Sequence, residues 1–165
     1  IDSLSAGGEV DLIVRKLNHL VAEGLDFDQV VNGTTAYQAK TKLLFVLAKV
    51  DNLVKNGRLS KLVGTVVGLL NIRMVGEASK TGTLELLQKA RGQKKAIKAA
   101  FDELIKAGYA GGHITIAHRN NEKFIEQFSE LVREKFAQAS IEVLPTSGLC
   151  SFYAEEGGLL MGYEI

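Results

Sequence analysis

The first forty residues carry apolar side chains at helical spacing. Over residues 9–23 the apolar positions recur every three to four residues, which predicts an amphipathic helix that Gly24 can end. Asp26 is a suitable N-cap for a second helix that runs to about Gln38. The apolar stripe of the first helix consists of Val10, Ile13, Val14, Leu17, Leu20 and Val21. We expect these two helices to form a unit separate from the rest of the chain.

From Thr41 onward, short apolar runs alternate with longer amphipathic segments. The run TKLLFVLAK (41–49) is short and apolar, as in a buried strand. The pattern predicts further strands at 71–77, 81–90, 111–118, 141–145 and 157–165, and helices at 61–71, 91–108 and 120–139. The polar segment ASKTG between the second and third strands is typical of a hairpin loop. The order ββαβαββ after residue 70 predicts an α/β fold, in which a mixed β-sheet is layered with helices on one face or both.

An arginine without an acidic neighbour precedes the predicted helix at 61–71. An Asn-Gly turn precedes Arg58, and no acidic residue lies within six positions of it on either side. Gly64 and Gly68 lie on one face of the following apolar helix, which fits either tight core packing or the wall of an apolar ligand cavity. A guanidinium group pairs well with a carboxylate or phosphate. Arg58 with the Ser60 hydroxyl therefore predicts a site for an anionic head group.

The other candidate motifs carry weaker signals. The basic segment 89–98 is interpreted either as a solvated helix face or as a docking surface for an acidic partner. The segment SGLCSFYAEEGG (147–158) is interpreted as a loop at the end of a strand, of the kind that often lines a site. His113 and His118 lie on opposite faces of one predicted strand without further ligands nearby, so we expect no metal site there.

Composition narrows the class of protein. Of 165 residues, 46% are hydrophobic and 24% are charged, with a formal net charge of +1, as in an ordinary globular domain. This charge gives no general reason to expect nucleic acid as a partner. The apolar runs are shorter than the roughly 20 residues that cross a bilayer, so we expect no stable membrane insertion. A single cysteine, Cys150, excludes an internal disulfide and favours a cytoplasmic location. The first residue is not Met, so we expect a fragment of a longer chain.

Four segments together resemble a known family. They are IDSLSAGG, DNLVKNGRLSKLVGTVVGLLNIRMV, GTLELLQKARGQKKA and HITIAHRNNE, in this order along the chain. With them the chain resembles the C-terminal part of the DegV family. The resemblance spans essentially the whole chain, and the central block KNGRLSKLVGTVVGLLNI is its most specific part. By this resemblance, residues 1–40 are the remaining helices of a truncated N-terminal α/β domain, and residues 41–165 form a C-terminal lipid-binding α/β domain.

The resemblance implies a function. Such proteins are bacterial and cytoplasmic, bind a long-chain fatty acid, and serve as the lipid-carrying subunit of a fatty acid kinase. A separate ATP-dependent kinase subunit makes the acyl-phosphate for phospholipid synthesis, so we expect no catalytic residue, metal or cofactor in this chain. Arg58 and Ser60 would bind the lipid head group, with Tyr153 where the family often has a histidine. The acyl-chain pocket would be formed by Leu62, Val63, Val66, Val67, Leu69 and Leu70.

One alternative function follows from the residues alone. Arg58 could clamp an anionic substrate in a small-molecule enzyme, with Tyr153 as the acid. The sequence has no Walker loop, GxSxG elbow or HExxH motif, so this reading has little support. Nucleic-acid binding through residues 89–98 is a weaker alternative, because no aromatic residues interleave with the basic ones.

Overall fold

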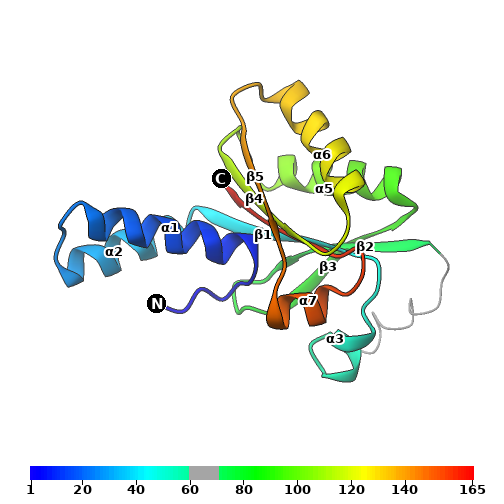
Figure 1. Ribbon diagram of the computed structural model, residues 1–165, viewed down its shortest axis with the longest axis horizontal. Coiled ribbons are helices and arrows are strands. Elements are labelled where there is room, and N and C mark those ends of the chain that lie inside the picture. Colours follow the sequence, from blue (N-terminus) through cyan, green and yellow to red (C-terminus); the bar gives the residue numbers. More distant parts are fainter. Residues whose placement is uncertain (60–70) are drawn as a thin grey trace.

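A single mixed β-sheet forms the centre of the molecule in a computed structural model that describes residues 1–59 and 71–165 (Figure 1). The strands are β1 (Thr41–Leu47), β2 (Ile72–Ala78), β3 (Leu84–Arg91), β4 (His113–His118), β5 (Ser140–Pro145) and β6 (Leu159–Glu164). Their order across the sheet is β3-β2-β1-β6-β4-β5. Only β4 and β5 pair in parallel, and the other neighbouring pairs are antiparallel. The predicted mixed sheet, its strands and the β2–β3 hairpin are confirmed.

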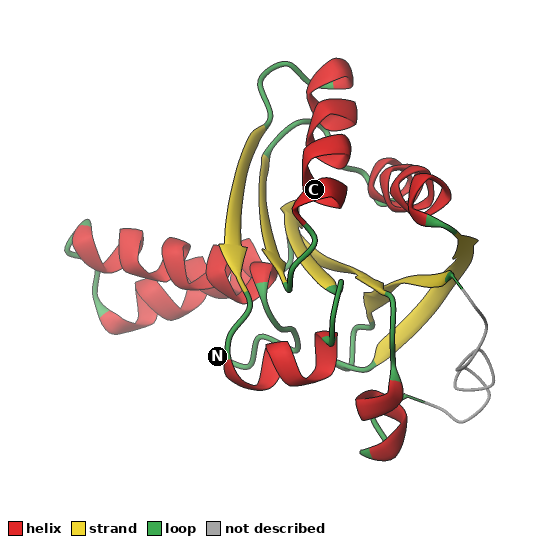
Figure 2. Ribbon diagram, turned by 45° about the vertical axis from the view of Figure 1, so that its right-hand side comes forward, coloured by secondary structure: helices red, strands yellow, loops and turns green. Residues whose placement is uncertain are grey.

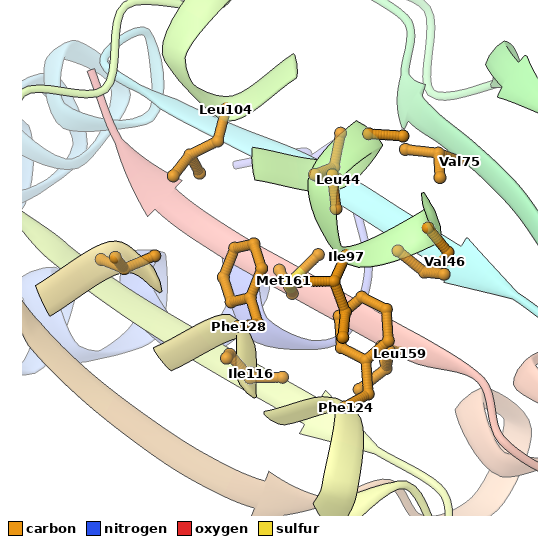
Figure 3. Close-up of a cluster of buried hydrophobic side chains, with 14 of the residues drawn as sticks. Leu44, Val46, Val75, Ile97, Leu104, Ile116, Phe124, Phe128, Leu159 and Met161 are labelled. Carbon is orange, nitrogen blue, oxygen red and sulfur yellow. The ribbon is translucent and has the colours of Figure 1, made fainter. Parts of the chain in front are cut away.

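Two long helices cover one face of the sheet. They are α5 (Gln93–Lys106) and α6 (Glu122–Lys135), which pack against each other and enclose the larger hydrophobic core (Figures 1 and 3). Phe124 and Phe128 of α6 stack with their ring centroids 6.0 Å apart, and Phe128 is fully buried. On the sheet side the core receives Leu44, Val46, Val75, Ile114, Ile116, Leu159, Met161 and Tyr163. Both helices were predicted from apolar periodicity.

The opposite face of the sheet carries shorter helices and a second, smaller core. Its helices are α3 (Asp51–Lys55) and α7 (Gly148–Ala154), which lie close together below the sheet (Figures 1 and 2). Alternate residues of β1 point into this core, because side chains of a strand alternate between its two faces. All of β1 from Leu43 to Leu47 is buried, so the strand is covered on both sides. The two cores therefore meet at β1, at the middle of the sheet.

A helical hairpin at the N-terminal end packs against this same face. It consists of α1 (Gly8–Ala22) and α2 (Phe27–Gln38), and it projects beyond the sheet (Figure 1). The predicted N-cap is confirmed, since the Asp26 side chain accepts a hydrogen bond from the Gln29 amide in a capping box. Val14 and Val21 of the predicted apolar stripe are 47% and 55% exposed, so that part of the prediction is wrong. The reason is that α1 contacts β1, β4 and β6 and then projects beyond the sheet, so part of the helix has only α2 to pack against.

The first turn of α1 lies directly on the sheet. A Cβ atom at Gly8 would come within 2.1 Å of the Thr115 carbonyl oxygen, and one at Gly162 within 2.1 Å of the Glu9 amide nitrogen. Only glycine at both positions allows the helix backbone to approach β4 and β6 so closely. Buried Glu9 is then satisfied by Thr41, whose hydroxyl donates to its carboxylate at 2.8 Å. This packing joins α1 to the sheet; the predicted domain boundary at residue 40 stays a prediction.

Candidate functional site

Arg58 is positioned by the end of α3. Gly57 adopts a φ of 65°, a conformation that glycine accommodates without a steric penalty. The Arg58 amide donates to the Leu53 carbonyl at 2.8 Å, which closes the turn after the helix. Leu59, next to it, is buried, whereas the Arg58 side chain is exposed. Among the described residues, Arg58 makes no ion pair within 4.0 Å, which agrees with the lack of acidic neighbours in the sequence.

Tyr153 lies beside Arg58, although the two are far apart in the sequence. The Arg58 guanidinium carbon lies 5.7 Å from the centroid of the Tyr153 ring, which is within the range of a cation–π contact. Phe152 packs edge-on against Tyr153 with centroids 5.1 Å apart and is itself 46% exposed. The structure thus brings together two of the three predicted head-group residues. Their role in binding stays a prediction.

The segment that carries Tyr153 is helical. The interpretation of 147–158 as a loop is wrong for residues 148–154, which form α7. Asn52 joins α7 to α3: its side-chain amide donates to the Phe152 carbonyl at 2.9 Å, and its backbone amide donates to the Glu155 carboxylate at 3.0 Å. Helices this short are not stable on their own, so these long-range contacts stabilise both. Asn52 is therefore a positioning residue for the Arg58–Tyr153 pair that the sequence analysis missed.

A cavity of about 410 Å³ extends from this pair along the face of β1. Its walls are mostly apolar, and its size lies in the range of small-molecule binding sites. Arg58 and Tyr153 both line it. The other lining residues are Leu4, Ser5, Ala6, Leu43, Phe45, Leu47, Leu53, Gly57, Ala78, Gly82, Thr83, Leu84, Leu149, Cys150, Ala154 and Leu160. An arginine and a phenol beside an apolar cavity can hold an amphiphilic anion.

The apolar walls come from segments that sequence reasoning did not assign to the site. Leu43, Phe45 and Leu47 alternate along β1, and Leu160 faces the same cavity from β6. Because residues 43–47 are all apolar, the sequence indicates a strand that is buried on both faces but not which of its faces lines a cavity. Phe45 occupies its place because its partner across the sheet is Gly76: a Cβ there would come within 2.3 Å of the Phe45 ring. That pair sits at an irregularity in the β2–β3 ladder.

Several predicted site residues lie outside the described part of the chain. These are the head-group residue Ser60 and the acyl-pocket residues Leu62, Val63, Val66, Val67, Leu69 and Leu70. The same holds for the predicted helix at 61–71, apart from Asn71, which is described as a turn. Their assignment to the site stays a prediction.

The two histidines and the cysteine considered in the sequence make only common structural contacts. His113 contacts the Ser140 hydroxyl at 3.0 Å and lies 3.8 Å from the Glu142 carboxylate, while His118 accepts a hydrogen bond from the Asn121 amide. Within residues 1–59 and 71–165, no group of three or more His, Cys, Asp or Glu side chains is arranged to hold a metal ion. Cys150 is half-buried in the cavity wall. None of the helices in these ranges is long and apolar enough to cross a membrane.

The chain matches one protein family along nearly its whole length. The family model described as "Uncharacterised protein, DegV family" matches residues 1–163. A DegV domain-containing protein of Streptococcus pneumoniae is 78% identical over 165 residues, which are all of this chain and 59% of that protein. One from Streptococcus gordonii is 75% identical over the same length, again 59% of the relative. The chain therefore spans about three-fifths of the length of these relatives.

Solved structures show the same fold. The crystal structure of the Streptococcus pneumoniae fatty acid kinase B3 protein, loaded with linoleic acid, superimposes with a TM-score of 0.97 at 78% identity. This chain is covered completely, and the match takes up 59% of that structure. A DegV family protein from Eubacterium eligens, loaded with heptadecanoic acid, has a TM-score of 0.95 at 36% identity over 99% of this chain and 59% of its own. On sequence and fold together, the chain belongs to the DegV family.

Proposed function

We propose that this protein binds a long-chain fatty acid in the cavity along β1, with the carboxylate at Arg58 and Tyr153. The observation that carries the proposal is the apolar cavity of about 410 Å³ with a guanidinium group at one end. An amphiphile with one anionic head and one apolar tail matches both features. The relatives from Streptococcus pneumoniae and Eubacterium eligens that are loaded with fatty acids support this ligand class.

The energetics favour such a ligand. Moving acyl carbons from water into an apolar cavity gains about 0.8 kcal/mol per CH₂, so the tail supplies most of the affinity. A carboxylate carried into the site without a partner would lose part of that gain. Because Arg58 is exposed, its charge is screened by water and contributes a modest share of the free energy. Its main effect is to fix which end of the fatty acid reaches the surface.

The proposal includes a partner. A carboxylate held at an exposed arginine remains accessible to a second protein, whereas the tail is enclosed by the sheet. The Streptococcus pneumoniae relative is named as the B3 protein of fatty acid kinase. We therefore assign this protein the role of a cytoplasmic lipid-carrying subunit, which presents the carboxylate to a separate ATP-dependent kinase subunit. The phosphoryl transfer takes place on that subunit.

Extraction and mass spectrometry test the lipid-binding role. The protein is purified, extracted with organic solvent, and its bound fatty acid is quantified per mole of chain. We expect stoichiometric fatty acid in the wild type and a several-fold weaker rebinding by Arg58→Ala. Arg133→Ala, which removes an exposed arginine from the last turn of α6, is the matched control and should bind as the wild type does. Absence of fatty acid from the wild-type extract would overturn fatty acid as the ligand. Equal rebinding of fatty acid by the wild type and both variants would overturn the role of Arg58.

A second measurement separates a carrier from an enzyme. The small-molecule enzyme with Tyr153 as its acid predicts turnover of an anionic substrate by this protein alone, and loss of that turnover in Tyr153→Phe. The carrier predicts acyl-phosphate formation only when the kinase subunit and ATP are both present. Acyl-phosphate formed without the kinase subunit would contradict the carrier.

A further inference from the structure

The N-terminal segment crosses the face of the sheet that carries α3 and α7. It does so at one end of the cavity of about 410 Å³ along β1, called the acyl cavity below. Gly7 packs against Leu160 of β6, where a Cβ would come within 2.7 Å of the leucine side chain. Leu4 contacts Gly82 in the β2–β3 hairpin, with its backbone 3.3 Å from a Cβ placed there. Since β1 lies between β6 and β2, residues 4–7 span the sheet across β1. In Figure 1 this segment is the dark blue trace that passes beneath the sheet.

This crossing lies at the end of the cavity away from Arg58. Leu47 is at the carboxyl end of β1, which leads into α3 and Arg58. Leu43 is near the other end, where β2 finishes at Ala78 and the hairpin begins. Leu43 and Leu47 are four residues apart, which corresponds to about 13 Å along a strand. A fatty acid whose carboxylate is at Arg58 would therefore direct its methyl end toward Leu43 and Leu4.

A second cavity lies on the other side of Leu4. Its volume is about 540 Å³, and it shares Leu4, Leu43 and Ala78 with the acyl cavity. Its other walls are largely polar and include Glu9, whose carboxylate is hydrogen-bonded to Thr41. The acyl cavity has the more apolar walls, so an acyl tail gains more by staying within it. Leu4 thus stands at the boundary between an apolar and a polar compartment.

Leu4 is held firmly at this boundary. Its φ of 51° lies in the left-handed region, which is unfavourable for a leucine and persists only where the surroundings enforce it. The Leu4 amide donates to the Asp2 side chain at 3.1 Å, and the Ser5 amide donates to the Ser3 hydroxyl at 3.4 Å. Together with the Gly82 contact, these bonds fix the turn that places the leucine side chain in the wall of both cavities.

We propose that Leu4 closes the methyl end of the acyl cavity and sets the longest fatty acid chain that the protein accepts. This inference rests on the proposed fatty acid binding in the same cavity. A tail that reaches Leu4 leaves any further methylene outside the apolar walls. Shortening the side chain at position 4 removes the wall, and enlarging it moves the wall toward Arg58.

Binding of a series of saturated fatty acids of increasing length tests the proposal. The purified protein is delipidated, and the dissociation constant is measured for each length in wild type, Leu4→Ala and Leu4→Phe. Each methylene newly accommodated in Leu4→Ala should improve binding of the longer acids relative to the wild-type optimum by up to about fourfold. Leu4→Phe should shift the optimum to shorter acids. Leu149→Ala is the matched control, since it truncates another exposed leucine of the same cavity, on α7 near Tyr153.

The outcomes separate this inference from the function on which it rests. If no fatty acid of any length binds to the wild type, the proposed function fails. If fatty acids bind and both Leu4 variants retain the wild-type length profile, the role of Leu4 is overturned while the proposed function stands. An equal shift in Leu149→Ala would also overturn it, because the length limit would then not be located at Leu4. Opposite shifts in the two Leu4 variants, with none in the control, support the inference.

Discussion

Arg58 and Tyr153 form the polar end of the cavity, and Arg58 contacts the aromatic ring of Tyr153. The guanidinium lies over the aromatic ring, 5.7 Å from its centroid. The family resemblance places Tyr153 where a histidine is often found, a position from which its hydroxyl would donate a hydrogen bond to the carboxylate. The geometry adds another role, because the ring can hold the guanidinium in place before the ligand arrives. The two roles make different predictions for the hydroxyl group.

Substitutions of Tyr153 separate the two roles. We expect Tyr153→Phe to keep most of the affinity for fatty acid, because the ring remains. Tyr153→Leu should weaken binding by about 0.5–1 kcal/mol, the usual value of an exposed cation–π contact. Titration with one fatty acid at constant ionic strength gives both values. If Tyr153→Phe is as weak as Tyr153→Leu, the hydroxyl makes the important contact.

A buried tyrosine in the larger core predicts how stability responds to alkali. Burial raises the pKa of the Tyr109 phenol to about 12, and the negative charge of Glu164 adds to the shift. Burial also raises the pKa values of Tyr37 and Tyr163. The folded state therefore retains these protons at a pH where the unfolded chain, with phenol pKa values near 10, has lost them. The stabilisation is complete below about pH 10 and is lost as the pH rises toward 12.

Tyr109→Phe isolates one of these phenols. The Tyr109 hydroxyl donates to the Gly112 carbonyl at 2.8 Å, so the variant should be less stable by about 1 kcal/mol at pH 8. Between pH 10 and pH 12 its free energy of unfolding should fall less steeply than that of the wild type, by up to about 1.4 kcal/mol per pH unit. Urea unfolding at several pH values measures both effects. Parallel pH profiles would show that Tyr109 has an ordinary pKa in the folded protein.

At the scale of elements, the sequence pattern predicted the two long amphipathic helices and the fully apolar strand. The apolar spacing in 91–108 and 120–139 predicted α5 and α6, and the run TKLLFVL predicted β1. The short helices α3 and α7 have too few residues for a period to emerge, and α7 lacks a side-chain N-cap. They exist because Asn52 connects them, a contact between residues 100 and 103 positions apart. Such contacts cannot be read from local sequence.

The candidate site was also predictable only in part: its arginine could be identified from the sequence, but its walls could not. Arg58 was identified because no acidic residue lies within six positions of it and an apolar run follows. The walls of the cavity depend on which strands lie next to β1, and the antiparallel neighbours β2 and β6 come from distant parts of the chain. Leu4 could not be assigned at all, because nothing in IDSLSAGG indicates that it crosses a sheet. The sequence pattern therefore identifies a candidate charged residue, whereas the sheet topology determines which residues enclose the cavity.

The link between α3 and α7 leads to a prediction at the element scale. Asn52→Ala removes the hydrogen bond to the Phe152 carbonyl, which should destabilise the protein by about 1 kcal/mol. It should also weaken fatty acid binding, because α7 and Tyr153 lose their attachment to α3 and Arg58. Asn18→Ala, at an exposed position on α1, is the control and should change neither property. Thermal unfolding and lipid titration measure the two effects, and full affinity in Asn52→Ala would show that α3 and α7 are held together by other contacts.

At the scale of the whole molecule, the helical hairpin α1–α2 is coupled to the sheet by its closest backbone contact. The sequence analysis predicted residues 1–40 as a unit separate from 41–165. In the structure the first turn of α1 lies against β4 and β6, where Gly8 and Gly162 leave no room for a side chain. The acyl cavity includes residues on both sides of that boundary, since Leu4 and Phe45 both line it. Strong coupling would mean that the end wall at Leu4 is as stable as the sheet itself.

Gly162→Ala measures this coupling. The added Cβ would come within 2.1 Å of the Glu9 amide nitrogen, a backbone atom that cannot rotate away, so α1 has to move off the sheet. We expect a loss of about 2–3 kcal/mol in a single cooperative transition, at the upper end of the cost of overpacking. Gly33→Ala is the matched control: its Cβ would meet only the tip of the Leu20 side chain at 2.8 Å, and alanine favours the helix, so stability should change by less than about 1 kcal/mol. Urea unfolding followed by circular dichroism compares the two variants. If Gly162→Ala instead unfolds in two steps, with residues 41–165 retaining wild-type stability, then the helices before Thr41 are a separate unit and the end wall at Leu4 belongs to the less stable part.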